Sequence, residues 1–183
     1  TNIGIYLLSL CAARELGLTG EEIARGLDAF AGAHRRFELT ATIEGVKLYH
    51  DYGHNPAEFH SVIPLADAVA RDHRLFVVCQ PHTYSRTKLL LDQYMTCFTA
   101  AHEVLITDIY AAREKDPGDI HATMLVDALQ KHGVPAVYTP DFDACENYLR
   151  THWQPGDVMI SLGCGNINLL NEQIARHEAE KTN

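Results

Sequence analysis

The sequence has no long apolar run and little positive charge. No window approaches the roughly 18 consecutive apolar residues of a membrane span, and no signal peptide, basic and then apolar, opens the chain. Lys and Arg number 15 against 24 Asp and Glu, for a net charge of -9, and they form no tract. These absences argue against a nucleic-acid groove or an anionic membrane surface as a partner.

Closely spaced cysteines are also lacking. The sequence has five cysteines: Cys11, Cys79, Cys97, Cys145 and Cys164. They contain no C-x-x-C pair, and most of them lie among apolar neighbours. An odd number without short spacings does not indicate a disulfide framework or a zinc knuckle. We therefore expect reduced core cysteines in a cytoplasmic protein.

What remains is the composition of a globular domain. Hydrophobic residues make up 46% and charged residues 21% of the 183 residues, with a mean hydropathy of -0.14, which excludes a disordered, collagen-like or coiled-coil chain. The length suits one α/β domain, or one domain with part of another. Eleven histidines are unusually many and suggest a metal site or an acid–base centre.

The chain contains two parts with different sequence patterns, and the first of them is helical. Residues 3–16 have helical spacing and end at Gly17, and Thr19 with Glu22 forms a capping box for a second short helix. The helical pattern breaks over residues 32–38, which we take as the candidate domain boundary.

Beyond this boundary, strands alternate with amphipathic helices. A hairpin is predicted at 39–43 and 46–50, followed by strands near 74–79, 103–108, 135–138 and 157–162. Helices are predicted near 57–71, 88–101, 121–132, 142–152 and 167–178. The pattern predicts an α/β fold, a Rossmann-like three-layer domain with a mostly parallel sheet, an N-terminal hairpin and helices on both faces.

Polar residues gather just past the predicted strands, at the edge where parallel sheets bind ligands. The second strand is followed by His50-Asp51-Tyr52-Gly53-His54-Asn55-Pro56. Asp51 could accept ribose hydroxyls, and Tyr52 and His54 could orient a polar substrate group. For each residue alone a structural role in the loop, such as a helix cap, is the favoured explanation. A cap needs only one such residue, however, so the cluster as a whole predicts function.

A second polar cluster, residues 80–88, follows the next strand and contains His82, Arg86 and Lys88. Both cations are expected near a helix N-terminus, where the helix dipole disfavours them. An anion such as a carboxylate or phosphate would offset this cost. The alternative is a solvated loop with two surface cations.

Other strand ends carry weaker signals. Asp108 and Tyr110 are equally well explained by function and by structure, and residues 113–116 are expected to be a solvated loop. Gly163-Cys164-Gly165-Asn166 lacks the third glycine of a dinucleotide fingerprint. No G-x-x-x-x-G-K-[ST] motif occurs, so the chain by itself is not expected to hold ATP as a P-loop does.

The histidine spacing does not predict a metal site. His50, His54 and His60 straddle a turn and a proline, which excludes the helical i, i+4 zinc pair. His102, His132, His152 and His177 are expected in helices or at their ends, on the surface.

Together these motifs resemble the C-terminal domain of the Mur ligases. The resemblance rests on Arg35-Arg36-Phe37-Glu38, D-Y-G-H-N-P at 51–56, Q-P-H-T-Y-S-R-T at 80–87 and D-I-Y-A-A-R-E-K at 108–115. It is greatest for the branch that joins L-alanine to UDP-N-acetylmuramate. It implies that residues 1–37 are the helical end of the central ATPase domain with a linker, cut from a larger protein, and that residues 38–183 are the amino-acid-binding domain.

The resemblance implies an ATP-dependent ligase of peptidoglycan synthesis with three domains. It would phosphorylate the carboxylate of UDP-N-acetylmuramate, and the amine of L-alanine would attack the acyl phosphate. ATP and Mg²⁺ are implied for the full-length enzyme, with the P-loop and the magnesium ligands outside this chain. The fragment is therefore expected to be inactive alone.

The resemblance also implies residue roles. Arg36 would reach the γ-phosphate with Arg35 beside it, and Asp51 would hold the ribose. The residues around the alanine and the reacting carboxylate would be Tyr52, His54, His82 and Arg86. Arg86 would pair with the alanine carboxylate, and Arg36, His54 and His82 would be catalytic.

Some positions depart from the family pattern. Asn55 stands at the second His of a D-Y-G-H-H-P turn, and Ile5 stands where an adenine-contacting Asn is often found. Cys164 and Asn166 replace the usual residues of a Gly-Ala-Gly-Asp segment. Two alternatives stay open: a recycling ligase that attaches a murein tripeptide, and a non-catalytic nucleotide- or partner-binding module.

Overall fold

The computed structural model describes residues 2–30 and 32–181, with side chains from residue 7 onward. The chain forms two compact units, Thr1–His34 and Arg35–Asn183. The side chains of Ile3 and Ile5, on which two expectations rest, lie outside the described residues.

The first unit is a pair of helices, α1 (Asn2–Glu15) and α2 (Gly20–Asp28). Gly17 ends the α1 turn with a φ of +85°, a conformation that glycine adopts without strain. The predicted capping box is confirmed, because Thr19 Oγ1 accepts from the Glu22 amide and Glu22 Oε2 accepts from the Thr19 amide. Large apolar side chains on this unit are exposed: Leu7, Leu8, Leu16, Leu18 and Phe30.

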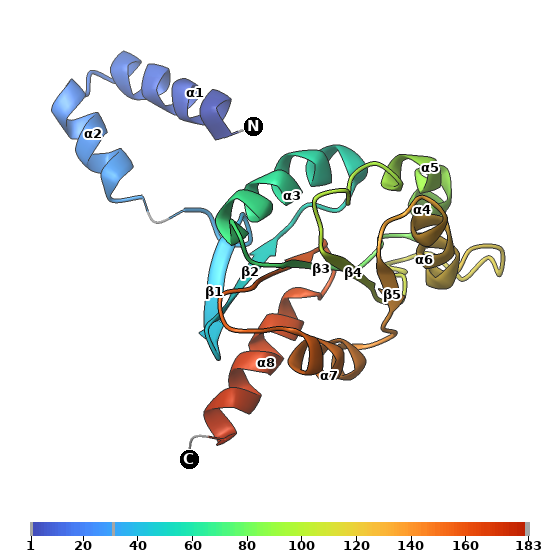
Figure 1. The fold of residues 1–183 in the computed structure, drawn as a ribbon. Coiled ribbons are helices and arrows are strands. Elements are labelled where there is room, and N and C mark those ends of the chain that lie inside the picture. The colour runs from blue at the N-terminus through green and yellow to red at the C-terminus, as the bar shows by residue number, and fades with distance from the viewer. Residues whose placement is uncertain (1, 31, 182–183) are drawn as a thin grey trace. The chain divides into compact units, whose positions relative to one another are not determined.

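The second unit is built on one sheet of six strands in the order β1-β2-β6-β3-β4-β5 (Figure 1). The strands are β1 (Glu38–Ile43), β2 (Val46–Asp51), β3 (Leu75–Cys79), β4 (Glu103–Ile106), β5 (Ala136–Tyr138) and β6 (Val158–Leu162). β1 pairs antiparallel with β2, and the other pairings are parallel. Glu44 and Gly45 both have positive φ in the predicted hairpin turn, the requirement of a type I′ turn.

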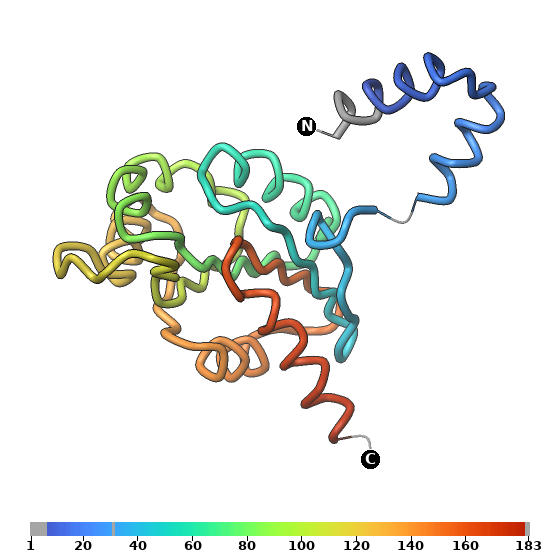
Figure 2. The backbone as a smooth tube through the Cα atoms, turned by 180° about the vertical axis from the view of Figure 1, so that it is seen from behind, coloured from blue at the N-terminus to red at the C-terminus, as the bar shows by residue number. Residues whose placement is uncertain are grey.

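Helices cover both faces of this sheet. The helices are α3 (Pro56–Ala70), α4 (Tyr84–Leu89), α5 (Leu91–Tyr94), α6 (Ala122–Lys131), α7 (Phe142–His152) and α8 (Asn168–Lys181). One core cluster joins the sheet to α3, α5 and α6, and the other joins it to α7 and α8. Figure 2 shows the same two layers from behind. The predicted three-layer α/β fold is confirmed, and none of the described helices is long and apolar enough to cross a membrane.

The predicted helix at 88–101 is wrong. α4 already begins at Tyr84, and α5 ends at Tyr94. The following residues run through single turns with i→i−3 bonds, such as Cys97 N to Tyr94 O and Ala101 N to Phe98 O. Tyr94 and Phe98 fill the core at nearly helical spacing, which makes the sequence look like one continuous helix.

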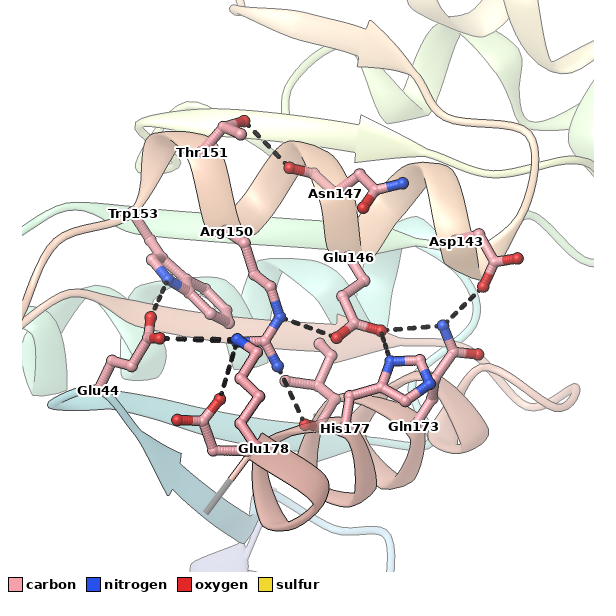
Figure 3. A network of polar contacts seen from close by, with 12 residues as sticks. Glu44, Asp143, Glu146, Asn147, Arg150, Thr151, Trp153, Gln173, His177 and Glu178 are labelled. Carbon is pink, nitrogen blue, oxygen red and sulfur yellow. Dashed lines mark hydrogen bonds and ion pairs between the residues drawn. The ribbon is translucent and has the colours of Figure 1, made fainter. Parts of the chain in front are cut away.

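A buried carboxylate of α7 joins this helix to α8 (Figure 3). Glu146 is 4% exposed, and its oxygens accept hydrogen bonds from Arg150, Gln173 and His177 at 2.8 to 3.0 Å. Arg150 also bonds Glu178 at 3.0 Å and lies 3.8 Å from Glu44 in the hairpin turn. Burial alone raises the pKa of Glu146, but the three hydrogen bonds outweigh it and the pKa is lowered.

Glu146→Gln is expected to destabilise the second unit by about 1 to 3 kcal/mol at pH 7, because it removes the buried charge that Arg150 and His177 face. Since the folded pKa lies below the ordinary value of 4.5, this stabilisation is present above pH 4.5 and is lost as the pH falls through the folded value. Urea unfolding at pH 7 and pH 3 measures both effects. Glu180→Gln on the exposed side of α8 is the control, and equal losses in the two variants would contradict the prediction.

Candidate functional site

Three strands end at the same level. Leu162 at the end of β6 pairs with Asp51 of β2 on one side and with Cys79 of β3 on the other. The chain that leaves β3 packs through α5 on one face of the sheet, and the chain that leaves β6 packs through α8 on the other face. Such a switch in direction opens a crevice at the carboxyl edge of a parallel sheet. The predicted site residues lie at this edge.

Asp51 forms hydrogen bonds that hold the backbone at the start of the second unit. It is 4% exposed, and its Oδ2 accepts from the Phe37 amide at 2.8 Å while Oδ1 accepts from the Gly53 amide at 2.7 Å. The carboxylate therefore fixes both the segment before β1 and the turn after β2. Its predicted contact with a ribose stays a prediction.

Arg35 and Arg36 differ in their contacts. Arg35 Nε donates to His50 Nε2 at 3.0 Å, and Arg35 Nη2 donates to the Gly165 carbonyl at 3.0 Å. Arg36 is exposed and has no hydrogen bond or ion pair to the described residues. Both guanidinium groups lie over the Tyr52 ring, at 4.9 and 5.4 Å from its centroid. Arg35 is thus built into the edge of the sheet, whereas Arg36 is available to a ligand.

The predicted aromatic and imidazole side chains form a continuous row. The Tyr52 and His54 ring centroids are 5.7 Å apart, and those of His54 and His82 are 6.1 Å apart. The next ring is Tyr110, which stacks on His82 at 5.6 Å. The row brings together residues that follow three different strands, β2, β3 and β4.

His54 and Asn55 share one carboxylate. Glu58 Oε2 accepts from the His54 amide and from Asn55 Nδ2, and Asn55 Oδ1 accepts from the Glu58 amide, so Asn55 caps α3. His54 Nδ1 lies 3.1 Å from the Tyr52 carbonyl, which can only accept. Nδ1 therefore carries the proton in the neutral ring, and Nε2 keeps its lone pair.

His82 and Arg86 each carry a buried polar atom at the site. His82 Nδ1 and Arg86 Nη1 are buried without a hydrogen bond to any described residue. The pKa of His82 is lowered by burial first, and then by the charges of Arg86 and His54. Because buried polar groups are nearly always paired, a guanidinium nitrogen without an acceptor fits a carboxylate or another anion.

The unfavourable helix dipole predicted at Arg86 and Lys88 is not found in the structure. Both residues lie in the last turn of α4, where the helix dipole favours cations, because α4 begins earlier than predicted. Lys88 is moreover paired with Asp119. The expectation of a bound anion therefore rests on Arg86 alone, whose Nη1 has no acceptor among the described residues.

Glu114 was missed by the prediction of a solvated loop at 113–116. Its carboxylate accepts from Thr83 Oγ1 at 2.6 Å, from the Ser85 amide at 2.9 Å and from Ser85 Oγ. Hydrogen bonds from Ser85 and Thr83 lower the pKa of Glu114 to about 2. The available signal was its place in the D-I-Y-A-A-R-E-K motif after the neighbouring strand.

The loop after β6 is closely packed against the site. A side chain at Gly165 would place its Cβ 2.4 Å from Gln80 Oε1 and 2.8 Å from Tyr110 Cγ. Gln80 Nε2 donates to Asn166 Oδ1 at 2.8 Å. A hollow of about 340 Å³ lies beside this contact, lined by Asp108, Asp141 and Phe142 among others. Over the described residues, no three His, Cys, Asp or Glu side chains gather as metal ligands would.

The chain matches a protein family and named ligases in sequence. A family model for the glutamate ligase domain of the Mur ligases matches residues 35–165. UDP-N-acetylmuramate--L-alanine ligases from Acetivibrio thermocellus and Caldanaerobacter subterraneus subsp. tengcongensis are 39% and 41% identical over 175 and 172 residues. These alignments cover 96% and 94% of this chain but 37% of each relative, so the chain spans little more than a third of their length.

Solved structures share the fold. A UDP-N-acetylmuramate-alanine ligase from Thermotoga maritima matches 98% of this chain and 38% of its own chain, with a TM-score of 0.81 and 20% identity. A murein peptide ligase from Psychrobacter arcticus matches 96% of this chain and 36% of its own, with a TM-score of 0.68 and 18% identity. At such identities the likeness establishes the fold alone.

The pKa of His82 is expected to lie below its ordinary value of 6.5 and to rise in Arg86→Gln, because the variant removes a neighbouring positive charge. The rise is partial, since burial is the larger cause. Imidazole chemical shifts followed by NMR across a pH titration measure it. Arg176→Gln on α8, an exposed arginine, is the control; an unchanged His82 titration in Arg86→Gln would contradict the prediction.

Proposed function

Because the chain belongs to the Mur ligase family, we propose that it is the C-terminal domain of an ATP-dependent ligase that joins L-alanine to UDP-N-acetylmuramate in peptidoglycan synthesis. The relatives that are 39% and 41% identical carry that activity in their names. The proposal includes upstream domains with the P-loop, the magnesium ligands and the nucleotide-sugar site. It also includes a cytoplasmic location, in keeping with five free cysteines.

Residues 1–37 are proposed to be the end of the central ATPase domain and its linker. The helix pair α1 and α2 exposes several large apolar side chains, with Leu8 and Leu16 72% and 82% exposed. Patches of this kind are usually covered by a partner surface. The rest of the central domain is the proposed cover.

The observation that carries the proposal is a pair of buried atoms at the edge of the sheet, Arg86 Nη1 and His82 Nδ1, to which no described residue is hydrogen-bonded. Arg86 would bind the carboxylate of L-alanine as a charge-assisted pair. The alanine amine must lose a proton when it attacks the acyl phosphate, and a neutral imidazole can accept it. His82, kept neutral by its lowered pKa, and His54, with its free Nε2, are suited to this task.

Arg36 is the proposed contact for the phosphate. It is exposed, free of ion pairs to the described residues and held over Tyr52, so it can offset the charge that develops on a transferring phosphoryl group. Arg35 would orient its neighbour from its anchored position, and Asp51 would contact the ribose. ATP would supply the phosphoryl group that activates the UDP-N-acetylmuramate carboxylate. The described residues offer no cage for Mg²⁺, so no step here is assigned to it.

Arg86→Ala in the full-length ligase is expected to raise the KM for L-alanine roughly 100-fold, because a buried ion pair loses one partner. The KM for ATP is expected to stay within about twofold, since Arg86 is proposed to contact the amino acid alone. ADP release and product formation measure both constants, and Arg176→Ala is the matched control.

The same assay separates the alternatives. A murein tripeptide that outcompetes L-alanine would replace the proposal with the recycling ligase, whose fold is also shared. Full activity of both Arg36→Ala and Arg86→Ala would indicate a non-catalytic module instead.

Residues 1–183 alone are expected to release no phosphate in response to L-alanine, because the proposed P-loop lies outside them. A phosphate-release assay with UDP-N-acetylmuramate, ATP and L-alanine measures this, with the full-length ligase as the positive control. Release that depends on alanine would refute the assignment of the ATP site to the upstream domain.

A further inference from the structure

Two segments that follow neighbouring strands run alongside each other at the site. One is residues 81–88, which carries His82 and Arg86, and the other is residues 110–119, here called the strap. The Tyr110 amide donates to the Pro81 carbonyl at 2.8 Å, and the Tyr110 ring stacks on His82. At the far end of the strap, Asp119 pairs with Lys88.

Glu114 makes the central contact between the two segments. It accepts from Thr83 Oγ1, from the Ser85 amide and from Ser85 Oγ. The Lys88–Asp119 pair is more than half exposed on both sides, and exposed pairs of this kind contribute little. Glu114 therefore makes most of the hydrogen bonds between the strap and the start of α4.

The start of α4 has no cap from its own segment. Thr83 occupies the N-cap position, but its side chain makes no capping hydrogen bond to the helix. The Ser85 amide is instead capped by Glu114, which lies 29 residues further along the chain. A carboxylate at this end of a helix also has a favourable interaction with the exposed amides.

The residues held by Glu114 alternate with the proposed amino-acid contacts. Thr83 follows His82 directly, and Ser85 precedes Arg86 directly. A shift of the backbone at Thr83 or Ser85 would therefore move both the imidazole and the guanidinium. Neither His82 Nδ1 nor Arg86 Nη1 has a hydrogen bond to a described residue that would hold it in place.

We propose that Glu114 is a positioning residue that sets the His82–Arg86 turn for the amino-acid substrate. This inference rests on the proposed function, because it takes His82 and Arg86 as the contacts of the incoming amino acid. Glu114 acts through Thr83 and Ser85 and does not itself touch the substrate. Its lowered pKa, about 2, keeps it ionised as an acceptor over the whole working range of pH.

The test is a double-mutant cycle in the full-length ligase with Glu114→Gln, Ser85→Ala and the double variant. Glu114→Gln is expected to raise the KM for L-alanine about tenfold with the KM for ATP within twofold. Ser85→Ala keeps the amide and loses the hydroxyl, so its effect is smaller. The double variant is expected to resemble Glu114→Gln, because both substitutions remove the same contact.

Asp116→Asn is the matched control, since it removes a carboxylate of the strap whose contact is the Gly118 amide of its own turn. If Glu114→Gln only reduced the stability of the fold, the fraction of active enzyme would fall. The kcat would then fall in equal measure whether L-alanine or ATP is varied. Equal KM values for L-alanine in Glu114→Gln and wild type would overturn the inference, as would fully additive effects in the cycle.

A second readout does not depend on the reaction. Amide exchange followed by NMR on residues 1–183 is expected to speed up at Ser85 in Glu114→Gln and not in Asp116→Asn. Unchanged exchange at Ser85 would overturn the inference even if the ligase is active. If the wild-type ligase joins a different amino acid, the proposed function is wrong about the substrate. The same KM comparison, made with that amino acid, still tests the role of Glu114.

Discussion

The pairing of Leu162 with both Asp51 and Cys79 determines where everything else at the site lies. A parallel ladder allows β6 to lie between β2 and β3, so three chain segments leave the sheet from one level. Asp51 then uses its two oxygens on the Phe37 and Gly53 amides. A slip of one residue in this register would turn Asp51 towards the other face of the sheet. The arginines ahead of β1 and the imidazole after β2 would then lose their common anchor.

The parts of the fold that the sequence predicts are those with local signals. Buried parallel strands such as β3 are continuous apolar runs, so their ends, and with them the polar residues just beyond, can be located within one or two positions. The start of α4 cannot, because Thr83 does not cap it and the residue that does, Glu114, lies on the next strand connection. A contact across 29 residues leaves no mark in a local window, and the same contact made Glu114 look like a loop residue.

The many histidines separate according to their partners. His177 faces the buried Glu146, and His50 lies between Arg35 and Ser161. His132 ends α6, as predicted for a histidine near a helix C-terminus, whereas His102 precedes β4 instead of ending a helix. His82 differs from these, because its Nδ1 is buried without a partner among the described residues. Partners, rather than positions in the sequence, distinguish His82 from the histidines with structural contacts.

Two departures from the family pattern place neutral asparagines at the site. Asn55 caps α3 through Glu58, and asparagine is among the best residues for that position. Asn166, which stands where the family pattern has an aspartate, accepts a hydrogen bond from Gln80 as a neutral group. Both residues hold loops in place as neutral groups. In a chain with a net charge of -9, the sheet edge carries both arginines and carboxylates. The carboxylates of Asp51, Glu58 and Glu114 accept hydrogen bonds from the chain itself. Arg86 Nη1 has no acceptor among the described residues, so it can still pair with an anion.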